Sequence, residues 1–253
     1  MRRYCFLLLL FTTLPASRLH PQTAGCLALN LPDWASQTSG RGKGLGWMAF
    51  TRQYFSVSDW NASGAGLQWL APPAVTSLLA CRDGIAGFAR YHLFVSHHHQ
   101  AGPIDATLQL RFTWISARPQ PLAFRLGANA RITCRLADTA LAGIELFDLP
   151  GWISPDSPLT QGDPRLKALA VFNPDERLAL LMALELSTLM TGPLTGGVRV
   201  NLPGQLALEA ILHLMPGGVG VGVTWNASRC SVRTLFDHHI GPGLTPTILV
   251  DYR

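Results

Sequence analysis

The chain has 253 residues, of which 48% are hydrophobic and only 14% are charged. Average globular chains carry roughly a quarter charged residues, so this chain is unusually apolar. Its formal net charge of +5 is spread along the sequence without a basic run, which argues against nucleic-acid binding. The 24 Gly and 18 Pro favour many short strands joined by turns, within one all-β domain.

The N-terminus has the pattern of a secretory signal peptide. Met1-Arg2-Arg3 forms a charged start, and the apolar run that follows, to Pro15, is too short to span a bilayer as a helix. We expect a signal over residues 1–17, with cleavage after Ser17 or as late as residue 25. The mature chain, residues 26–253, is then an exported single domain in which we expect no membrane span.

Four cysteines remain after the signal, and an even number in an exported protein suggests two disulfides. Three connectivities are open, and the spacing contains no CxxC pair, so a structural zinc site is not expected. The disulfide candidates are Cys26, Cys81, Cys134 and Cys230.

Alternating apolar residues predict strands along the chain. Leu27, Leu29 and Leu31 form a short pattern near the mature N-terminus. The clearest alternation covers residues 104–114, where we expect the apolar set from Ile104 to Trp114 to be buried and the polar set from Asp105 to Thr113 to face water.

One helix is predicted, over residues 174–190. Asn173 and Pro174 suit a helix start, and the acidic residues Asp175 and Glu176 suit the positive end of the helix dipole. A strand from Leu178 to Leu186 is the competing interpretation, because short apolar runs fit both structures.

The chain ends in strand patterns. Residues 206–215 and 219–225 flank Pro216-Gly217-Gly218, which predicts a hairpin. Gly220 and Gly222 would leave room for a crowded neighbour. Ile248, Val250 and Tyr252 alternate with polar or smaller positions in a terminal strand, which must pair within a sheet or be completed by another chain.

No enzyme motif stands out, so we expect neither an enzyme nor a cofactor. His97, His98 and His99 point in alternating directions along a strand, so we expect no metal site, although His97 and His99 with one of His238 and His239 form the alternative. Trp34, Trp60 and Trp152 lie beside turn residues and are candidates for stacking on a carbohydrate.

Three of these features together resemble subunits of bacterial chaperone–usher fimbriae, in particular the long adhesive pilins. They are the export signal, the glycine-rich late hairpin Ala210–Trp225 and the alternating C-terminal strand with a penultimate tyrosine. The resemblance implies that Ile248, Val250 and Tyr252 bind a periplasmic chaperone or another subunit. It also implies that Leu27, Leu29 and Leu31 form a donated strand, for which an ordinary first strand is the alternative.

The sequence therefore predicts an immunoglobulin-like antiparallel sandwich with one inserted helix. The predicted function is a fimbrial subunit, minor or at the tip, which assembles by donor-strand exchange at the cell surface and binds host carbohydrate. The alternative is a secreted or viral glycoprotein that binds a host protein, suggested by the sequons at Asn61 and Asn226. A third possibility is a secreted hydrolase whose carboxylates converge only in the fold.

Overall fold

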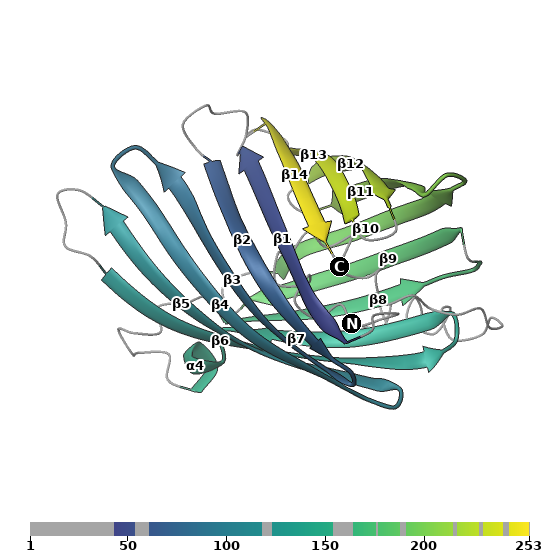
Figure 1. The fold of residues 1–253 in the computed structure, drawn as a ribbon, viewed down its shortest axis with the longest axis horizontal. Helices are drawn as coiled ribbons and strands as arrows, with labels where there is room; N and C mark the ends of the chain where they lie inside the picture. Colours follow the sequence, from purple (N-terminus) through teal and green to yellow (C-terminus); the bar gives the residue numbers. More distant parts are fainter. Residues whose placement is uncertain are drawn as a thin grey trace.

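The structure, a computed structural model, describes residues 43–53, 61–117, 123–153, 164–175, 177–187, 191–214, 217–227, 230–239 and 243–252. These residues form one closed antiparallel β-barrel (Figure 1). Its strands are β1 Gly44–Gln53, β2 Asn61–Ala71, β3 Ala74–Ile85, β4 Phe88–Ala101, β5 Ile104–Ala117, β6 Ala123–Ala137, β7 Ala140–Phe147, β8 Arg165–Phe172, β9 Leu178–Ser187, β10 Thr191–Leu202, β11 Leu206–Leu214, β12 Gly217–Asn226, β13 Cys230–His239 and β14 Gly243–Tyr252.

Each strand pairs with its neighbours in the sequence, and the last strand returns to the first. β14 pairs with β13 on one side and with β1 on the other, where Trp47 lies opposite Tyr252 and Arg52 opposite Thr247. The predicted sandwich is therefore wrong, because the sheet closes on itself instead of splitting into two packed layers. Closure also removes the open edge that a donated strand would need.

The two ends of the barrel differ. The end at which β1 begins and β14 finishes carries connections of two to five residues, and we call it the terminal end. The opposite end, which we call the loop end, carries the two longest connections, residues 54–60 and 148–164. The second of these contains a single helical turn, α4 Leu149–Ile153, which contacts β6.

The helix predicted over residues 174–190 is wrong, and the competing strand interpretation is confirmed by β9. The apparent helix cap is a turn between β8 and β9. The Asp175 carboxylate Oδ1 accepts hydrogen bonds from the backbone N–H groups of Arg177 (2.7 Å) and Leu178 (2.8 Å). Asn and Asp close turns of this kind as readily as they cap helices, so these residues alone could not distinguish a helix start from a turn between strands.

The predicted late hairpin is confirmed by β11 and β12, which pair from Leu206 with Trp225 to Leu214 with Gly217. Gly220 and Gly222 face crowded neighbours, as expected. A Cβ atom on Gly222 would lie 3.0 Å from Leu235 Cδ1 and 3.2 Å from the carbonyl oxygen of Thr234.

No helix among the described residues is long and apolar enough to cross a bilayer.

Gly64 marks a place where the inner wall is packed tightly. It lies opposite Phe50 in the β1–β2 pair and opposite Cys81 in the β2–β3 pair. A Cβ atom on Gly64 would come within 2.6 Å of Phe50 Cε1, of Cys81 Cβ and of the carbonyl oxygen of Ala80. Phe50, which is itself buried, therefore occupies the space that a side chain at position 64 would need.

We expect Gly64→Ala to destabilise the barrel by about 1–3 kcal/mol, the usual cost of overpacking a filled site. Equilibrium unfolding in urea, followed by tryptophan fluorescence in lipid vesicles, measures the change. Gly196→Ala is the matched control, because a Cβ atom on Gly196 meets nothing within 4 Å. Equal stability of the two variants would show that Phe50 and Ala80 move aside without cost.

Candidate functional site

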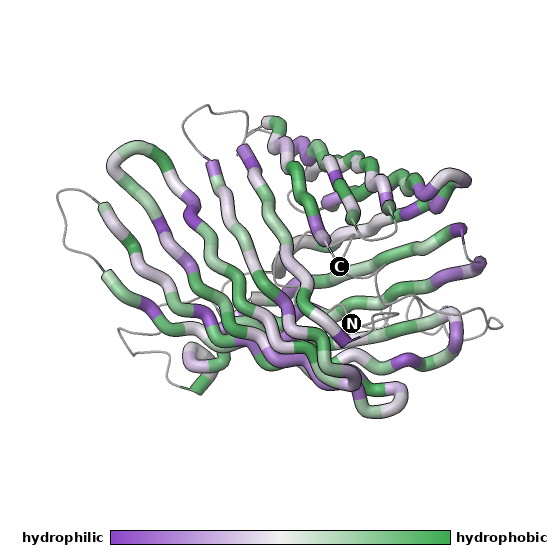
Figure 2. Tube along the Cα trace, viewed as in Figure 1, coloured by the Kyte–Doolittle hydropathy of each residue, from purple (hydrophilic) through white to green (hydrophobic). Residues whose placement is uncertain are grey.

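Side chains alternate between the two faces of the barrel wall, and the alternation in β5 is the reverse of the predicted one. Gln109 and Thr113 are buried, and Asp105 and Thr107 are partly buried, on the face that points inward. The apolar set, which includes Ile104, Leu108 and Leu110, is exposed on the outer surface. Figure 2 shows hydrophilic and hydrophobic positions alternating along the strands.

Charged residues follow the same division. Of the eighteen Asp, Glu, Lys and Arg residues in the strands, only Arg82 lies on the outer face. The inner face carries ten basic and seven acidic residues: Arg52, Arg90, Arg111, Arg125, Arg131, Arg135, Arg165, Lys167, Arg199, Arg233, Asp83, Asp105, Glu145, Glu185, Glu209, Asp237 and Asp251. The barrel is thus polar inside, with an excess of three positive charges, and apolar outside.

The outer face exposes large apolar side chains around the whole circumference. Trp69 is 69% exposed and Leu45 66%, and further exposed residues occur on nearly every strand, among them Leu67, Leu78, Leu126, Ile132, Ile144, Leu208, Leu212, Val219, Val221, Val223, Phe236 and Ile248. Soluble monomers rarely expose so large an apolar surface, which marks contact with lipid or another protein. The expectation of no membrane span is contradicted, because it considered only helices, whereas a strand of about 10 residues also crosses a bilayer.

Aromatic residues gather near the two ends of the outer face. Trp47, Trp69, Trp225 and Tyr252 lie near the terminal end, where the rings of Trp47 and Tyr252 stack with centroids 5.9 Å apart. Tyr91, Trp114 and Phe124 lie near the loop end, where the rings of Trp114 and Phe124 are 5.7 Å apart. Aromatic girdles of this kind mark the two water interfaces of membrane barrels.

A row of alternating charge crosses four strands of the inner wall. Arg131, Glu145, Lys167 and Glu185 lie directly opposite one another on β6, β7, β8 and β9. Arg131 Nη2 donates to Glu145 Oε2 at 3.0 Å. Arg165 Nη1 adds a bond of 2.6 Å to Glu185 Oε1, so each carboxylate in the row has a cationic neighbour. Opposite charges placed across strands attract, so the row stabilises this register.

A second, neutral row continues the polar wall across β4, β5 and β6. Asn129 Nδ2 donates to Gln109 Oε1 at 2.9 Å, and Gln109 Nε2 donates to Ser96 Oγ at 3.1 Å. The other amide oxygen, Asn129 Oδ1, accepts the backbone N–H of Asp148 at 3.0 Å. All four residues are buried, so the row satisfies polar groups that the barrel interior encloses.

Three buried charged residues form a triad on β10, β11 and β13. Glu209, whose side chain is 0% exposed, accepts Arg199 Nη1 at Oε1 over 3.0 Å and Arg233 Nη2 at Oε2. The Thr224 hydroxyl also donates to Glu209 Oε1, at 3.3 Å. One buried carboxylate therefore compensates two buried guanidinium groups, and the three side chains tie β10 to β13 across the inner wall.

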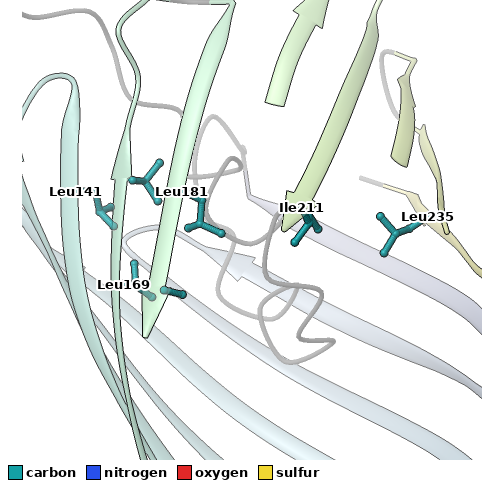
Figure 3. Close-up of a cluster of buried hydrophobic side chains, with 7 residues drawn as sticks. Leu141, Leu169, Leu181, Ile211 and Leu235 are labelled. Atoms are coloured by element: carbon teal, nitrogen blue, oxygen red, sulfur yellow. The ribbon is translucent and has the colours of Figure 1, made fainter. Parts of the chain in front are cut away.

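The inner wall also carries an apolar cluster, drawn in Figure 3. It faces the interior from β7, β8, β9, β11 and β13, and its members are Leu141, Leu169, Val171, Leu181, Ala183, Ile211 and Leu235. The cluster lies between the charged row that contains Lys167 and the triad around Glu209. The interior therefore combines charged, neutral polar and apolar surfaces.

The residues predicted to bind a chaperone, Ile248, Val250 and Tyr252, lie on the outer face of β14. Their strand is hydrogen-bonded on both sides, so it is part of the barrel seam instead of a segment offered to a partner. The predicted donor residues Leu27, Leu29 and Leu31 lie outside the described residues, as do Trp34 and Trp60. Trp152 belongs to α4, and its side chain is not described.

The histidine and cysteine candidates are separated by the strand alternation. His97 and His99 are exposed on the outer face of β4, whereas His98 points inward and pairs through Nδ1 with Thr107 Oγ1 at 2.9 Å. No group of three His, Cys, Asp or Glu side chains in the described part of the chain is arranged to hold a metal ion. Cys81, Cys134 and Cys230 are free thiols on β3, β6 and β13, and Cys26 lies outside the described residues, so the predicted pairing is not seen.

The inner charges were not predicted as a group. A signal was present in β6, where the charged residues Arg125, Arg131 and Arg135 all belong to one alternation set and the large apolar residues belong to the other. An alternation of this kind fits a membrane barrel as well as a soluble sandwich, because only the direction of the two faces differs.

We expect Glu209→Leu to lower the free energy of unfolding by about 3–5 kcal/mol, because it leaves two buried guanidinium groups without their anion. Urea unfolding in vesicles measures the loss. The triple variant Arg199→Met, Glu209→Leu, Arg233→Met removes the whole triad and should regain most of it. A single variant as stable as the parent would mean that water reaches the arginines.

We expect Val221→Arg, at the centre of β12 on the outer face, to destabilise the barrel by about 2–4 kcal/mol in a bilayer. The same substitution at Ile153, which is 84% exposed in α4, is the control and should change stability by less than about 0.5 kcal/mol. The comparison is made by unfolding both variants from vesicles. Similar effects would indicate that lipid does not cover β12.

No protein-family model and no curated protein matches this chain. Among solved structures, it resembles the TodX deltaS2S3 mutant, a monoaromatic hydrocarbon channel, with a TM-score of 0.59 and 8% identity over 86% of this chain and 92% of that one. A mutant of the Rh. blastica porin (TM-score 0.48, 7% identity, 83% and 98% covered) and the KdgM porin (0.46, 7%, 82% and 98%) are more distant.

The likeness to TodX shows a shared barrel fold. Together with the closed sheet, it overturns the interpretation as a fimbrial subunit, the predicted chaperone and pilus-subunit partners, and the location in a fimbrium. The alternative, a secreted or viral glycoprotein, gains no support from the fold or from the comparisons.

Proposed function

We propose that this protein is a channel of a bacterial outer membrane, through which small solutes cross inside the barrel. The carrying observation is the distribution of charge: seventeen of the eighteen charged strand residues face inward, while the outer face is apolar. Buried charge lining an interior suits a polar path, and an apolar outer wall suits hydrocarbon.

The strand number supports a path wide enough for solutes. Barrels of about eight strands are filled by their own side chains, whereas barrels of about 16–18 strands enclose an aqueous channel. Fourteen strands lie between these cases, close to the wider one. The barrel fold shared with TodX, itself described as a channel, favours a channel over an enzyme.

The inner charges favour anions among polar solutes. The inner face carries ten basic and seven acidic residues, and several of the acidic residues already form ion pairs with arginines. Arg111 lies on the inner wall against Gly127, where a Cβ atom would be 3.1 Å from Arg111 Nη2. Arg125 lies one diagonal step away on β6, so the two guanidinium groups form a basic patch toward the loop end.

The apolar inner cluster favours a second candidate, the passage of small apolar molecules. Its seven side chains, from Leu141 to Leu235, form a contiguous apolar surface on the inner wall. TodX is described as a channel for monoaromatic hydrocarbons, which makes this class worth testing here. Uptake of toluene and of chloride by the same proteoliposomes distinguishes the two candidates.

We expect the protein in planar bilayers to conduct, with a reversal potential in a tenfold KCl gradient whose sign indicates preference for chloride. The double variant Arg111→Gln, Arg125→Gln should lower the chloride preference, because it removes two of the ten inner cations. Arg177→Gln, in the exposed turn before β9, is the control and should leave the reversal potential unchanged. Bilayers that stay silent while the inserted barrel is folded would contradict the channel.

A further inference from the structure

Arg82 is the exception to the distribution of charge. It lies on the outer face of β3, in the set that continues Thr76, Leu78 and Ala80, while its neighbour Asp83 points inward. Asp83 is engaged there by Arg90 at 2.7 Å and lies 3.4 Å from His92 Nε2. In the described part of the chain, no carboxylate forms an ion pair with Arg82.

The position of Arg82 is at the loop end of the outer wall, three residues before β3 finishes at Ile85. A single row of directly opposite outer residues crosses β2 to β6 at this level: Ser63, Arg82, Tyr91, Trp114 and Phe124. Three of the five are aromatic. Because Tyr and Trp of membrane barrels sit at headgroup depth, Arg82 lies at the depth of lipid phosphates.

The donors of Arg82 are mostly uncommitted. Arg82 Nη1 donates to Asn61 Oδ1 at 3.4 Å, a weak bond that steadies the guanidinium beside β2. A guanidinium has five N–H donors in a planar fork that matches two phosphate oxygens at once. Its long apolar stem can lie along the wall while the charged group reaches the interface.

We propose that Arg82, flanked by Asn61 and Tyr91, binds the phosphate of an anionic lipid in the leaflet at the loop end. This inference rests on the proposed membrane location, and it adds a specific lipid contact to it. The occupant is anionic lipid because the site offers one cation, polar neighbours and an aromatic row, and no partnering acid among the described residues.

The test uses the full mature chain in nanodiscs that contain equal amounts of phosphatidylglycerol and phosphatidylcholine. Enrichment of a fluorescent phosphatidylglycerol probe around the barrel is read from energy transfer from tryptophan. Since a basic residue near an anionic surface contributes about 1 kcal/mol, Arg82→Gln should lower the relative affinity for phosphatidylglycerol about fivefold. Arg82→Lys should retain most of it, and 1 M NaCl should weaken it in the parent protein.

Arg177→Gln is the control, because it removes the same charge at the terminal end, away from the aromatic row. Equal enrichment in the parent and in Arg82→Gln, with both barrels inserted, would overturn the lipid site and leave the channel proposal intact. A chain that fails to insert into nanodiscs would overturn both. If Arg82→Gln fails to fold, the salt measurement on the parent protein decides. Loss of phosphatidylglycerol enrichment in 1 M NaCl, with the barrel still folded, supports the site, and enrichment that does not change with salt overturns it.

Discussion

Closure of the sheet between β1 and β14 is the constraint on which the rest of the structure depends. A strand surrounded by lipid has no water to hydrogen-bond its backbone, so each N–H and C=O group must find a partner in another strand. The pairing of Trp47 with Tyr252 and of Arg52 with Thr247 supplies the last set of partners. Without this seam, two exposed edges would remain, and the apolar outer face would be attached to a sheet that aggregates.

Once the sheet is closed, each strand has one face toward the interior and one toward the surroundings, and the chain uses the two faces for opposite chemistry. Large apolar residues and two aromatic groups cover the outside. All but one of the charged strand residues lie inside, and several of them are paired across neighbouring strands. The row from Arg131 to Glu185 and the triad around Glu209 follow the same principle. In both, each carboxylate forms an ion pair with an arginine. The excess of basic over acidic strand residues leaves the inner wall with a net positive charge.

Arg82 and Arg125 show that the face of the strand on which a residue lies determines its surroundings. Both are arginines near the loop end, on β3 and β6, and nothing in their local sequence distinguishes their roles. The alternation of the strands places Arg125 on the inner wall, with the other inner cations, and Arg82 on the outer wall, level with Tyr91 and Trp114. The same side chain therefore belongs to the polar inner wall in one case and to the apolar outer wall in the other.

The sequence by itself determined that the chain is all-β, where most strands run, and which residues share a face. The alternation in residues 104–114 and the late hairpin at residues 206–225 were both readable, because strand periodicity is a local property. Local signals failed at Asn173 to Asp175, since Asp175, which suits the first turn of a helix, closes the turn before β9. What only the tertiary structure decided is the direction of the faces. Whether Gln109 or Leu108 points to the centre depends on whether the sheet packs against a second layer or curls until β14 meets β1, and that contact joins residues at opposite ends of the chain. The position of each inner residue is set by closure, so the charged rows, the Glu209 triad and the outer Arg82 could not be assembled from sequence spacing alone.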